Sequence, residues 1–153
     1  MMNLSSEVIA AYRSRTIATA ESLTGGGIGA SLTSVPGSSA VYKGGIISYT
    51  DEIKHALLGV PKETLEKFGA VSAPVAEAMA EGARKALCVD AAVSVTGLAG
   101  PSGDDYGNPV GTVYIGFSND EKTISMHFVF GGDREAVRSQ TIEAALKLFL
   151  ENK

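Results

Sequence analysis

The sequence predicts an α/β protein, more narrowly a three-layer α/β/α sandwich built on a mixed β-sheet. Segments with helical periodicity precede and separate the first three strand-like segments, which is the order that parallel strands require. Two further strand-like segments lie close together before a last helical segment, which indicates an antiparallel hairpin. The 18 glycines suit the tight junctions of such a fold, and 153 residues suit a single domain over residues 1–153.

Hydrophobic periodicity assigns the elements of the first half of the chain. Apolar residues recur at helical spacing before the first strand and again after it, and Pro36-Gly37 ends the second of these helices. The predicted elements are, in order, a helix over 4–13, a strand over 16–20, a helix over 28–35, a loop over 37–40 and a strand over 44–49.

Capping residues add to the periodicity in the second half. Asp51 is predicted to cap a short helix that Gly59 and Pro61 close, and Ser72 to cap the next helix. The strand over 91–96 is almost continuously apolar, as a buried central strand should be. The remaining elements are a glycine-rich loop over 97–109, strands over 110–117 and 123–129, and a final helix after Asp133.

Composition and charge exclude several classes of protein. The net charge is −4 and Lys and Arg do not cluster, which argues against a groove for nucleic acid. No apolar run approaches the roughly 20 residues that cross a membrane, and the N-terminus lacks the features of a signal peptide. Cys88 is the one cysteine, so no intrachain disulfide forms. We therefore expect a cytoplasmic protein that binds neither nucleic acid nor membrane.

Three polar, glycine-rich junctions follow the first three strands: Glu21–Gly27, Tyr49–Lys54 and Gly97–Gly107. In open α/β sheets, ligands bind beyond the carboxyl ends of the parallel strands. Because all three junctions leave those ends, the sequence predicts that they converge on one functional cleft.

The first junction carries the most information. A strand runs into Glu21, Ser22 and Thr24, and three glycines lead into a helix, whose N-terminus offers backbone N–H groups to an anion. The Ser22 hydroxyl has two readings: a nucleophile that faces the cleft, or a serine that only bonds nearby backbone groups.

A serine nucleophile needs a base, and the sequence offers two kinds. His55 lies in a short helix and His127 inside a strand pattern, and neither has an orienting carboxylate in sequence, so we expect both to be structural or solvated. Lys54 follows Tyr49 at the predicted cleft rim, where desolvation would lower its proton affinity. The alternative for Lys54 is an exposed helix lysine.

The sequence also carries a partial match to a dinucleotide-binding site. Gly25–Ala30 matches the G-x-G-x-x-G/A fingerprint and Asp51 ends the second strand, so a small dinucleotide-binding oxidoreductase is one alternative. The chain lacks the second mononucleotide half that such proteins carry, and it has no Walker-type motif. No spacing of His, Cys and Asp indicates a metal site, so we expect neither metal nor cofactor.

Seven motifs follow one another along the chain and together resemble the CinA C-terminal domain family, whose members include nicotinamide mononucleotide deamidases. The resemblance spans nearly the whole sequence. The motifs are Ala20-Glu-Ser-Leu-Thr-Gly-Gly26, Pro36-Gly-Ser-Ser39, Ser48-Tyr49 with Lys54, Gly69-Ala-Val-Ser72, Thr96-Gly-Leu-Ala-Gly-Pro101, Pro109-Val-Gly-Thr-Val113 and Gly132-Asp-Arg134.

The resemblance implies a three-layer α/β/α fold and hydrolysis of nicotinamide mononucleotide to nicotinic acid mononucleotide and ammonia. It implies that Ser22 is the nucleophile and Lys54 the base, with Tyr49 beside them as a third catalytic residue. Leu23 stands where many relatives have cysteine, and we expect the protein to lack the N-terminal molybdopterin-binding-like domain that longer relatives carry. The substrate-binding residues that it implies are Glu21, Thr24, Gly25, Gly26, Ser39, Thr96, Gly97, Gly100 and Arg134.

The expected chemistry assigns further roles within this set. Backbone N–H groups over Thr24–Gly26 are the expected oxyanion donors, and either the helix start over Gly25–Gly27 or Arg134 is expected to hold the substrate phosphate. A non-catalytic nucleotide-binding or sensing module on the same fold remains the alternative function. A homo-oligomer, dimer or higher, is compatible with the sequence.

Overall fold

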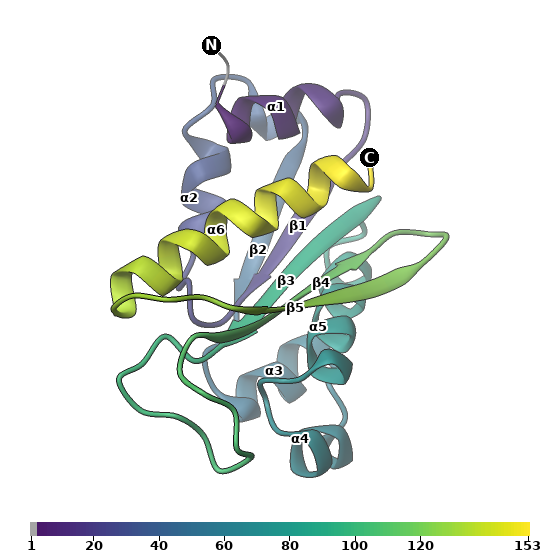
Figure 1. Cartoon of the computed structure of the whole chain (residues 1–153). Coiled ribbons are helices and arrows are strands. Elements are labelled where there is room, and N and C mark those ends of the chain that lie inside the picture. The colour runs from purple at the N-terminus through teal and green to yellow at the C-terminus, as the bar shows by residue number, and fades with distance from the viewer. Residues whose placement is uncertain (1–2) are drawn as a thin grey trace.

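The computed structural model describes residues 3–153, which form three layers around a five-stranded mixed sheet (Figure 1). The strand order is β2-β1-β3-β4-β5. The first three strands run parallel, and the last two form an antiparallel hairpin beside β3, as predicted. The strands are β1 (Ile17–Glu21), β2 (Tyr42–Ile47), β3 (Ala91–Gly97), β4 (Thr112–Ser118) and β5 (Thr123–Val129).

Helices cover both faces of the sheet, which confirms the three-layer fold (Figure 1). One face carries α1 (Leu4–Ala11), α2 (Gly27–Thr33) and α6 (Arg134–Glu151), which contact one another. The other face carries α3 (Asp51–Leu58), α4 (Lys62–Phe68) and α5 (Ala73–Ala86), and α5 packs on β3 and β4. A 3-10 turn, η1 (Ser38–Ala40), precedes β2.

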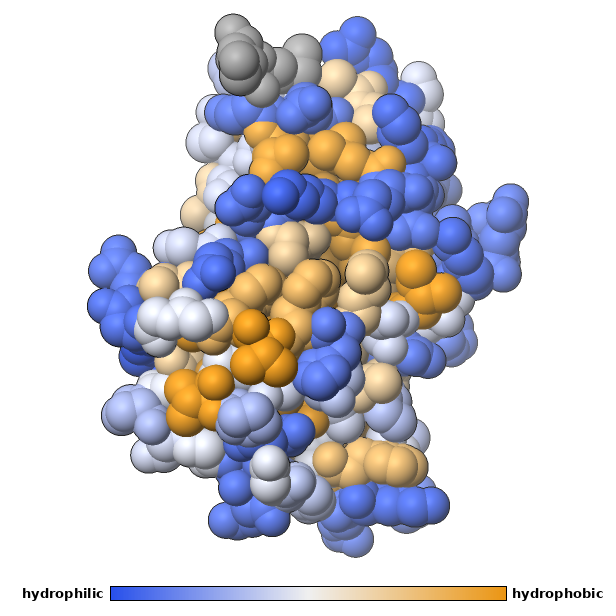
Figure 2. All heavy atoms as spheres, in the orientation of Figure 1, coloured by the Kyte–Doolittle hydropathy of each residue, from blue (hydrophilic) through white to orange (hydrophobic). Residues whose placement is uncertain are grey.

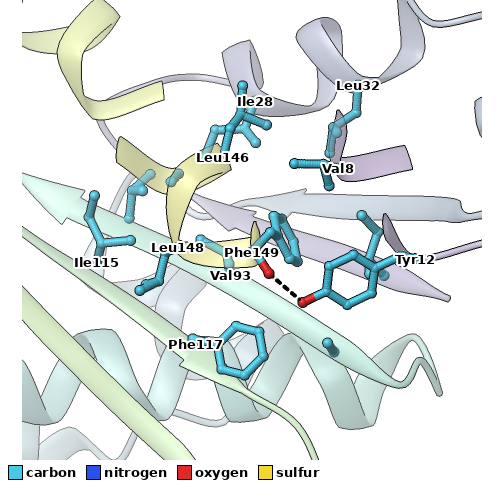
Figure 3. Packing of buried hydrophobic residues seen from close by; sticks show 14 of the residues in the cluster. Val8, Tyr12, Ile28, Leu32, Val93, Ile115, Phe117, Leu146, Leu148 and Phe149 are labelled. Atoms are coloured by element: carbon cyan, nitrogen blue, oxygen red, sulfur yellow. Dashed lines mark hydrogen bonds between the residues drawn. The ribbon is translucent and has the colours of Figure 1, made fainter. Parts of the chain in front are cut away.

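The core on the α6 face ties the two ends of the chain together (Figure 3). Tyr12, just after α1, packs edge-on against Phe149 of α6, with ring centroids 5.5 Å apart. The Tyr12 hydroxyl donates a hydrogen bond of 2.7 Å to the Phe149 carbonyl, and both side chains are fully buried. This contact anchors the C-terminal end of α6. The N-terminal end of the same helix reaches the carboxyl ends of the parallel strands, where its side chains contact the cleft loops.

The observed elements differ from the prediction in one helix and two helix caps, and in the bounds of two strands: β2 lies two residues earlier than the predicted 44–49, and β4 begins two residues after the predicted 110. Helix α4 was not predicted, because Leu65 and Phe68 are too few apolar residues to give a helical pattern. Thr50, not Asp51, caps α3: its side chain accepts from the Ile53 N–H at 3.4 Å. Ser72 precedes α5 as predicted, but its hydroxyl donates to the Gly69 carbonyl and caps no helix N–H.

The hairpin leaves apolar side chains at the surface beside α6. Met126, Phe128 and Phe130 line a groove of about 270 Å³ against Ala144 and Leu148 of α6, and Figure 2 shows apolar side chains on this face. The groove shares no lining residue with the hollows at the carboxyl ends of the parallel strands. Within residues 3–153, no helix is both long and apolar enough to cross a membrane.

Candidate active site

The three junctions that follow β1, β2 and β3 converge as predicted, and they enclose two adjoining hollows. The larger, about 450 Å³, is lined by Ser22, Lys54 and Thr96 among others. The smaller, about 330 Å³, is lined by Arg134 and by the loop after β3. Tyr49 lines both and is 61% exposed, so its ring stands between them.

Ser22 and Lys54 form a direct pair at the floor of the larger hollow. The Lys54 Nζ lies 3.0 Å from the Ser22 Oγ, although 32 residues separate the two in sequence. The same nitrogen donates to the carbonyl of Ser48 at 2.8 Å and lies 3.5 Å from that of Tyr49. Thr50 caps α3, so that Lys54 lies in the first turns of a helix that starts beside the end of β2. The sequence prediction that these two residues meet is therefore confirmed.

The Lys54 ammonium is buried and has no ion-pair partner within residues 3–153. The side chain is 1% exposed, and the ion pairs within residues 3–153 involve only Lys85 with Glu81 and Lys147 with Glu143. Burial lowers the pKa of Lys54 to about 8, and the nearby Asp51 carboxylate opposes this shift in part. The reading of Lys54 as an exposed helix lysine is wrong. An appreciable fraction of the amine is neutral near neutral pH, so it can accept a proton.

Glu21 fills the helix start that the sequence predicted as an anion site. One carboxylate oxygen accepts from the Thr24 hydroxyl at 2.6 Å and from the Ile28 N–H at 2.9 Å. The other accepts from the Gly29 N–H at 2.9 Å and from the Thr19 hydroxyl at 3.3 Å. Because the side chain is 2% exposed and its acceptors are taken, Glu21 organises the loop and contacts no open space. The Ile28 and Gly29 N–H groups at the start of α2 are therefore not available to a substrate phosphate or a dinucleotide pyrophosphate.

The loop after Ser22 turns sharply on two glycines with positive φ, 58° at Gly25 and 101° at Gly26, a conformation that side chains disfavour. Its carbonyls are satisfied internally: Ser22 accepts from the Gly25 N–H and Thr24 from the Gly27 N–H. The N–H groups of Leu23, Thr24 and Gly26 make no hydrogen bond within residues 3–153. Of the three predicted oxyanion donors, Gly25 is thus engaged elsewhere, and Thr24 and Gly26 are free.

Thr96 and Arg134 connect the cleft to its surroundings. The Thr96 hydroxyl donates to the Ala70 carbonyl at 2.8 Å, which orients an oxygen at the wall of the larger hollow. The guanidinium of Arg134 donates to the Gly100 carbonyl at 2.6 Å and to the Tyr49 hydroxyl at 3.1 Å. Gly97 lines both hollows, and a side chain there would collide with the backbone of Thr112.

Two predicted binding side chains, Glu21 and Thr24, are buried against each other beside the cleft and line neither hollow, and Ser39 lies away from the cleft altogether. Ser39 lies exposed in η1, before β2 begins, whereas Ser22 follows the end of β1, to which β2 runs parallel. The six residues of β2 span roughly 20 Å at about 3.3 Å per residue. Within one chain, Ser39 therefore stands at the far end of the sheet, and its binding role remains a prediction.

The histidines lie apart from Ser22, as predicted. His55 bonds the Val60 carbonyl through Nδ1 at 2.8 Å, and His127 stacks on Tyr114 with centroids 4.6 Å apart. Neither lines the hollow that holds Ser22. Within residues 3–153, no cluster of three or more His, Cys, Asp or Glu side chains is arranged to hold a metal ion.

Two contacts that hold the cleft loops were missed from the sequence. Arg138 of α6 donates to the carbonyls of Leu23 and Thr24 at 2.9 and 3.2 Å. Its position four residues after Arg134 on a helix, where the two share a face, was the available signal. The other is Tyr106, whose hydroxyl donates to the Glu66 carbonyl at 2.8 Å and holds the loop after β3 against α4.

Comparisons with known proteins identify the family and match the fold. The family model described as CinA C-terminal domain matches residues 2–153. A CinA-like protein of Endomicrobium trichonymphae is 48% identical over 88% of this chain, which spans only 31% of that protein. A nicotinamide-nucleotide amidohydrolase PncC of Enterobacter agglomerans is 44% identical over 97% of this chain and 95% of its own length. The crystal structure of the competence/damage inducible protein CihA of Agrobacterium tumefaciens matches with a TM-score of 0.94 and 37% identity, over 98% of this chain and 94% of that one.

Proposed function

Because the chain belongs to the CinA C-terminal domain family, we propose that it is an amidohydrolase that converts nicotinamide mononucleotide and water to nicotinic acid mononucleotide and ammonia. One observation carries the proposal: the buried Lys54 amine, without a carboxylate partner, lies 3.0 Å from the Ser22 hydroxyl. The amidohydrolase PncC supports the choice of substrate, since it is similar to this chain over nearly the full length of both.

The surroundings of Lys54 suit a neutral amine that acts as a base. A neutral amine has two N–H donors and one lone pair. The carbonyls of Ser48 and Tyr49 are positioned to accept from the two N–H groups, which leaves the lone pair for the Ser22 proton. In the acylation step the Ser22 Oγ adds to the amide carbon while its proton passes to Lys54.

The remaining steps return every group to its starting state. Lys54 passes the proton to the amide nitrogen, the C–N bond breaks, and ammonia leaves an ester on Ser22. A water molecule then gives a proton to Lys54 and adds to the ester carbon as hydroxide. The ester bond to Ser22 breaks, the Oγ takes the proton back from Lys54, and nicotinic acid mononucleotide is released. No metal ion takes part in these steps. We further propose that the protein is cytoplasmic, as expected from the sequence.

The two hollows suggest how the nucleotide lies. The amide would occupy the larger hollow beside Ser22, and the phosphate the smaller one beside Arg134, with the Tyr49 ring between them. Glu21 occupies the helix start, so Arg134 remains of the two phosphate sites expected from the sequence. Within residues 3–153, Gly100 and Tyr49 engage two of the five N–H donors of Arg134, so donors remain for an anion.

The test is an assay for ammonia with nicotinamide mononucleotide and with the riboside that lacks the phosphate. The wild type should release ammonia from the nucleotide. Arg134→Ala should lower kcat/KM for the nucleotide roughly 10- to 150-fold, the value of a charge-assisted contact, and hardly change it for the riboside. Equal losses for both substrates would remove Arg134 from the phosphate site. Saturable binding without ammonia would replace the proposal with the non-catalytic sensing module.

A further inference from the structure

Arg138 of α6 contacts the loop that follows Ser22, residues 23–27, through its charged side chain. Its Nε donates to the Leu23 carbonyl at 2.9 Å and its Nη2 to the Thr24 carbonyl at 3.2 Å. A side chain built on Gly25 would come within 3.8 Å of the same guanidinium, so the Arg138 head lies along the whole turn. The reaction steps above assign no role to this residue.

Because the peptide bond is planar, the hydrogen bond from Arg138 to the Leu23 carbonyl also sets the direction of the Thr24 N–H. In a trans peptide the C=O and the N–H that follows point in opposite directions. The Leu23 carbonyl points at Arg138 on the α6 face of the sheet, so the Thr24 N–H points away from α6. Lys54 reaches Ser22 from α3, on the opposite face of the sheet. The Thr24 N–H, which has no partner within residues 3–153, is therefore turned towards the side from which Lys54 approaches.

We propose that Arg138 is a positioning residue that fixes the Thr24 N–H as the oxyanion donor of the Ser22 reaction; this rests on the proposed function. By holding two successive carbonyls, Arg138 prevents the peptide planes from turning. Its positive charge at the carbonyl end also polarises the peptide and strengthens the N–H as a donor. Preorganised donors aimed at developing negative charge are among the largest contributions to catalysis.

The helix that carries Arg138 is well anchored for this purpose. The Asp133 side chain caps α6 by accepting from the Ala136 N–H at 2.9 Å, and Val137, beside Arg138, is fully buried. One turn earlier, Arg134 bonds the Gly100 carbonyl and the Tyr49 hydroxyl. The first two turns of α6 thus hold the loops on both sides of the cleft.

The first experiment compares Arg138→Ala and Arg138→Lys with the wild type, and uses Arg84→Ala as the matched control. The guanidinium of Arg84 also donates a hydrogen bond, to the Ser118 hydroxyl. Ser118 lies at the end of β4 that is remote from the cleft. With nicotinamide mononucleotide, Arg138→Ala should lower kcat about 100-fold and leave KM within about twofold, because only the transition state carries the oxyanion. Arg138→Lys should recover part of kcat, since an ammonium can hold one carbonyl. An unchanged kcat, or a loss that appears only in KM, would overturn the proposal.

A binding measurement separates positioning from a general structural role. The Ser22 Oγ adds to the carbonyl carbon of the analogue with an aldehyde in place of the carboxamide, the Ser22 proton passes to Lys54, and the former carbonyl oxygen occupies the oxyanion position. Arg138→Ala should weaken this adduct about 100-fold and leave the affinity for nicotinic acid mononucleotide unchanged. Equal weakening of both would mean that Arg138 only maintains the shape of the site.

Labelling of Ser22 by a fluorophosphonate keeps this inference distinct from the choice of substrate. The Ser22 Oγ displaces fluoride at phosphorus, its proton passes to Lys54, and the phosphoryl oxygen takes the oxyanion position. If the wild type releases no ammonia but Ser22 is labelled, the proposed substrate is wrong. The labelling rates of the wild type and Arg138→Ala then still test the positioning role of Arg138. About 100-fold slower labelling in Arg138→Ala supports the inference, and equal rates overturn it. If Ser22 is neither labelled nor active, both proposals fall.

Discussion

Two buried charged side chains lie on either side of Ser22, and their surroundings differ. Glu21 points into the start of α2, where two hydroxyls and two backbone N–H groups donate to its carboxylate. Lys54 points from α3 at the end of β2, where it meets two carbonyls and the Ser22 hydroxyl but no carboxylate. The two are almost equally buried, at 2% and 1% exposed.

The difference shows that the partners, not the burial, decide what a buried charge does. A carboxylate that receives four donors is locked in place and shapes the backbone around it. An ammonium without an anionic partner is destabilised by desolvation, so that the pKa of Lys54 falls to about 8. Glu21 is therefore predicted to contribute to stability, and Lys54 to reactivity.

The largest effect should come from removing either member of the reactive pair. Ser22→Ala and Lys54→Ala should each lower kcat more than about 10⁴-fold, because one proton transfer needs both groups. The double variant should be little worse than either single variant, since groups that act as a unit are not additive. Steady-state ammonia release measures all three.

Folding has to be checked beside that measurement. Ser22→Ala should unfold close to the wild-type midpoint, because the Ser22 side chain bonds only Lys54. Turnover near the wild-type rate in Ser22→Ala would show that Ser22 is not the nucleophile. Lys54 would then have no reactive role to set against the structural role of Glu21.

The second effect should appear in stability on the other side of Ser22. Glu21→Ala should lower the free energy of unfolding by about 3 kcal/mol, because it leaves the Ile28 and Gly29 N–H groups and the Thr24 hydroxyl without an acceptor in a buried place. Denaturant unfolding at neutral pH measures the loss.

A matched variant sharpens this result. Glu21→Gln keeps the size of the side chain and one acceptor oxygen, so its loss should be smaller than that of Glu21→Ala. If Glu21→Ala is as stable as the wild type, the Glu21 carboxylate does not stabilise the fold. The contrast between a stabilising Glu21 and a reactive Lys54 would then be wrong.

The sequence predicted the fold well, because the periodicity of hydrophobic residues and the glycines at the ends of helices and strands are local signals. The order of strands and helices and the convergence of three junctions all follow from such patterns, and the structure confirms them. Helix α4 was missed because it contributes only Leu65 to the buried core. A helix of seven residues with one buried side chain gives too weak a hydrophobic periodicity to be predicted from its own sequence.

The sequence predicted that Ser22 and Lys54 meet, but it did not predict the other contacts around them. Motif order brought Ser22 and Lys54 together, and their 3.0 Å contact confirms it. The same reasoning read the start of α2 as a free anion site, because a sequence does not show that Glu21 folds back onto the Ile28 and Gly29 N–H groups. Arg138 was missed for a similar reason: its partners are carbonyls 115 and 114 residues away, and a backbone acceptor leaves no mark in sequence.

The third effect tests the cost of burying Lys54. For this group, the shift from 10.5 to about 8 corresponds to about 3 kcal/mol at most. Lys54→Met fills similar space without a charge, so at pH 7 its free energy of unfolding should exceed that of the wild type by about 1–3 kcal/mol. Denaturant unfolding at several pH values measures the difference.

The sign of the pH dependence follows from proton binding. Between pH 8 and 10.5 the unfolded chain keeps the Lys54 proton and the folded protein loses it, so wild-type stability rises with pH across this window. The advantage of Lys54→Met should be largest below pH 8 and shrink towards pH 10.5. A constant difference over the whole range would show that Lys54 does not titrate with a lowered pKa.

The smallest effect is the pH dependence of the reaction itself. The base is the neutral amine, whose fraction rises tenfold per pH unit below a pKa of about 8 and then saturates. The kcat/KM for nicotinamide mononucleotide should therefore rise with pH and level off above about 8. A flat profile between pH 6 and 9 would exclude Lys54 as the base.

Asp51 offers a way to move this profile without touching the reacting atoms. Its carboxylate favours the charged form of Lys54 and so raises the pKa of that amine against the stronger effect of burial. Asp51→Asn removes the negative charge and keeps the shape, so the midpoint of the profile should move to lower pH while the plateau changes little. A midpoint that stays in place would mean that the profile reports another group. A shift to higher pH would contradict the electrostatics argued for Lys54, because only an added negative charge or a gain of solvent could produce it.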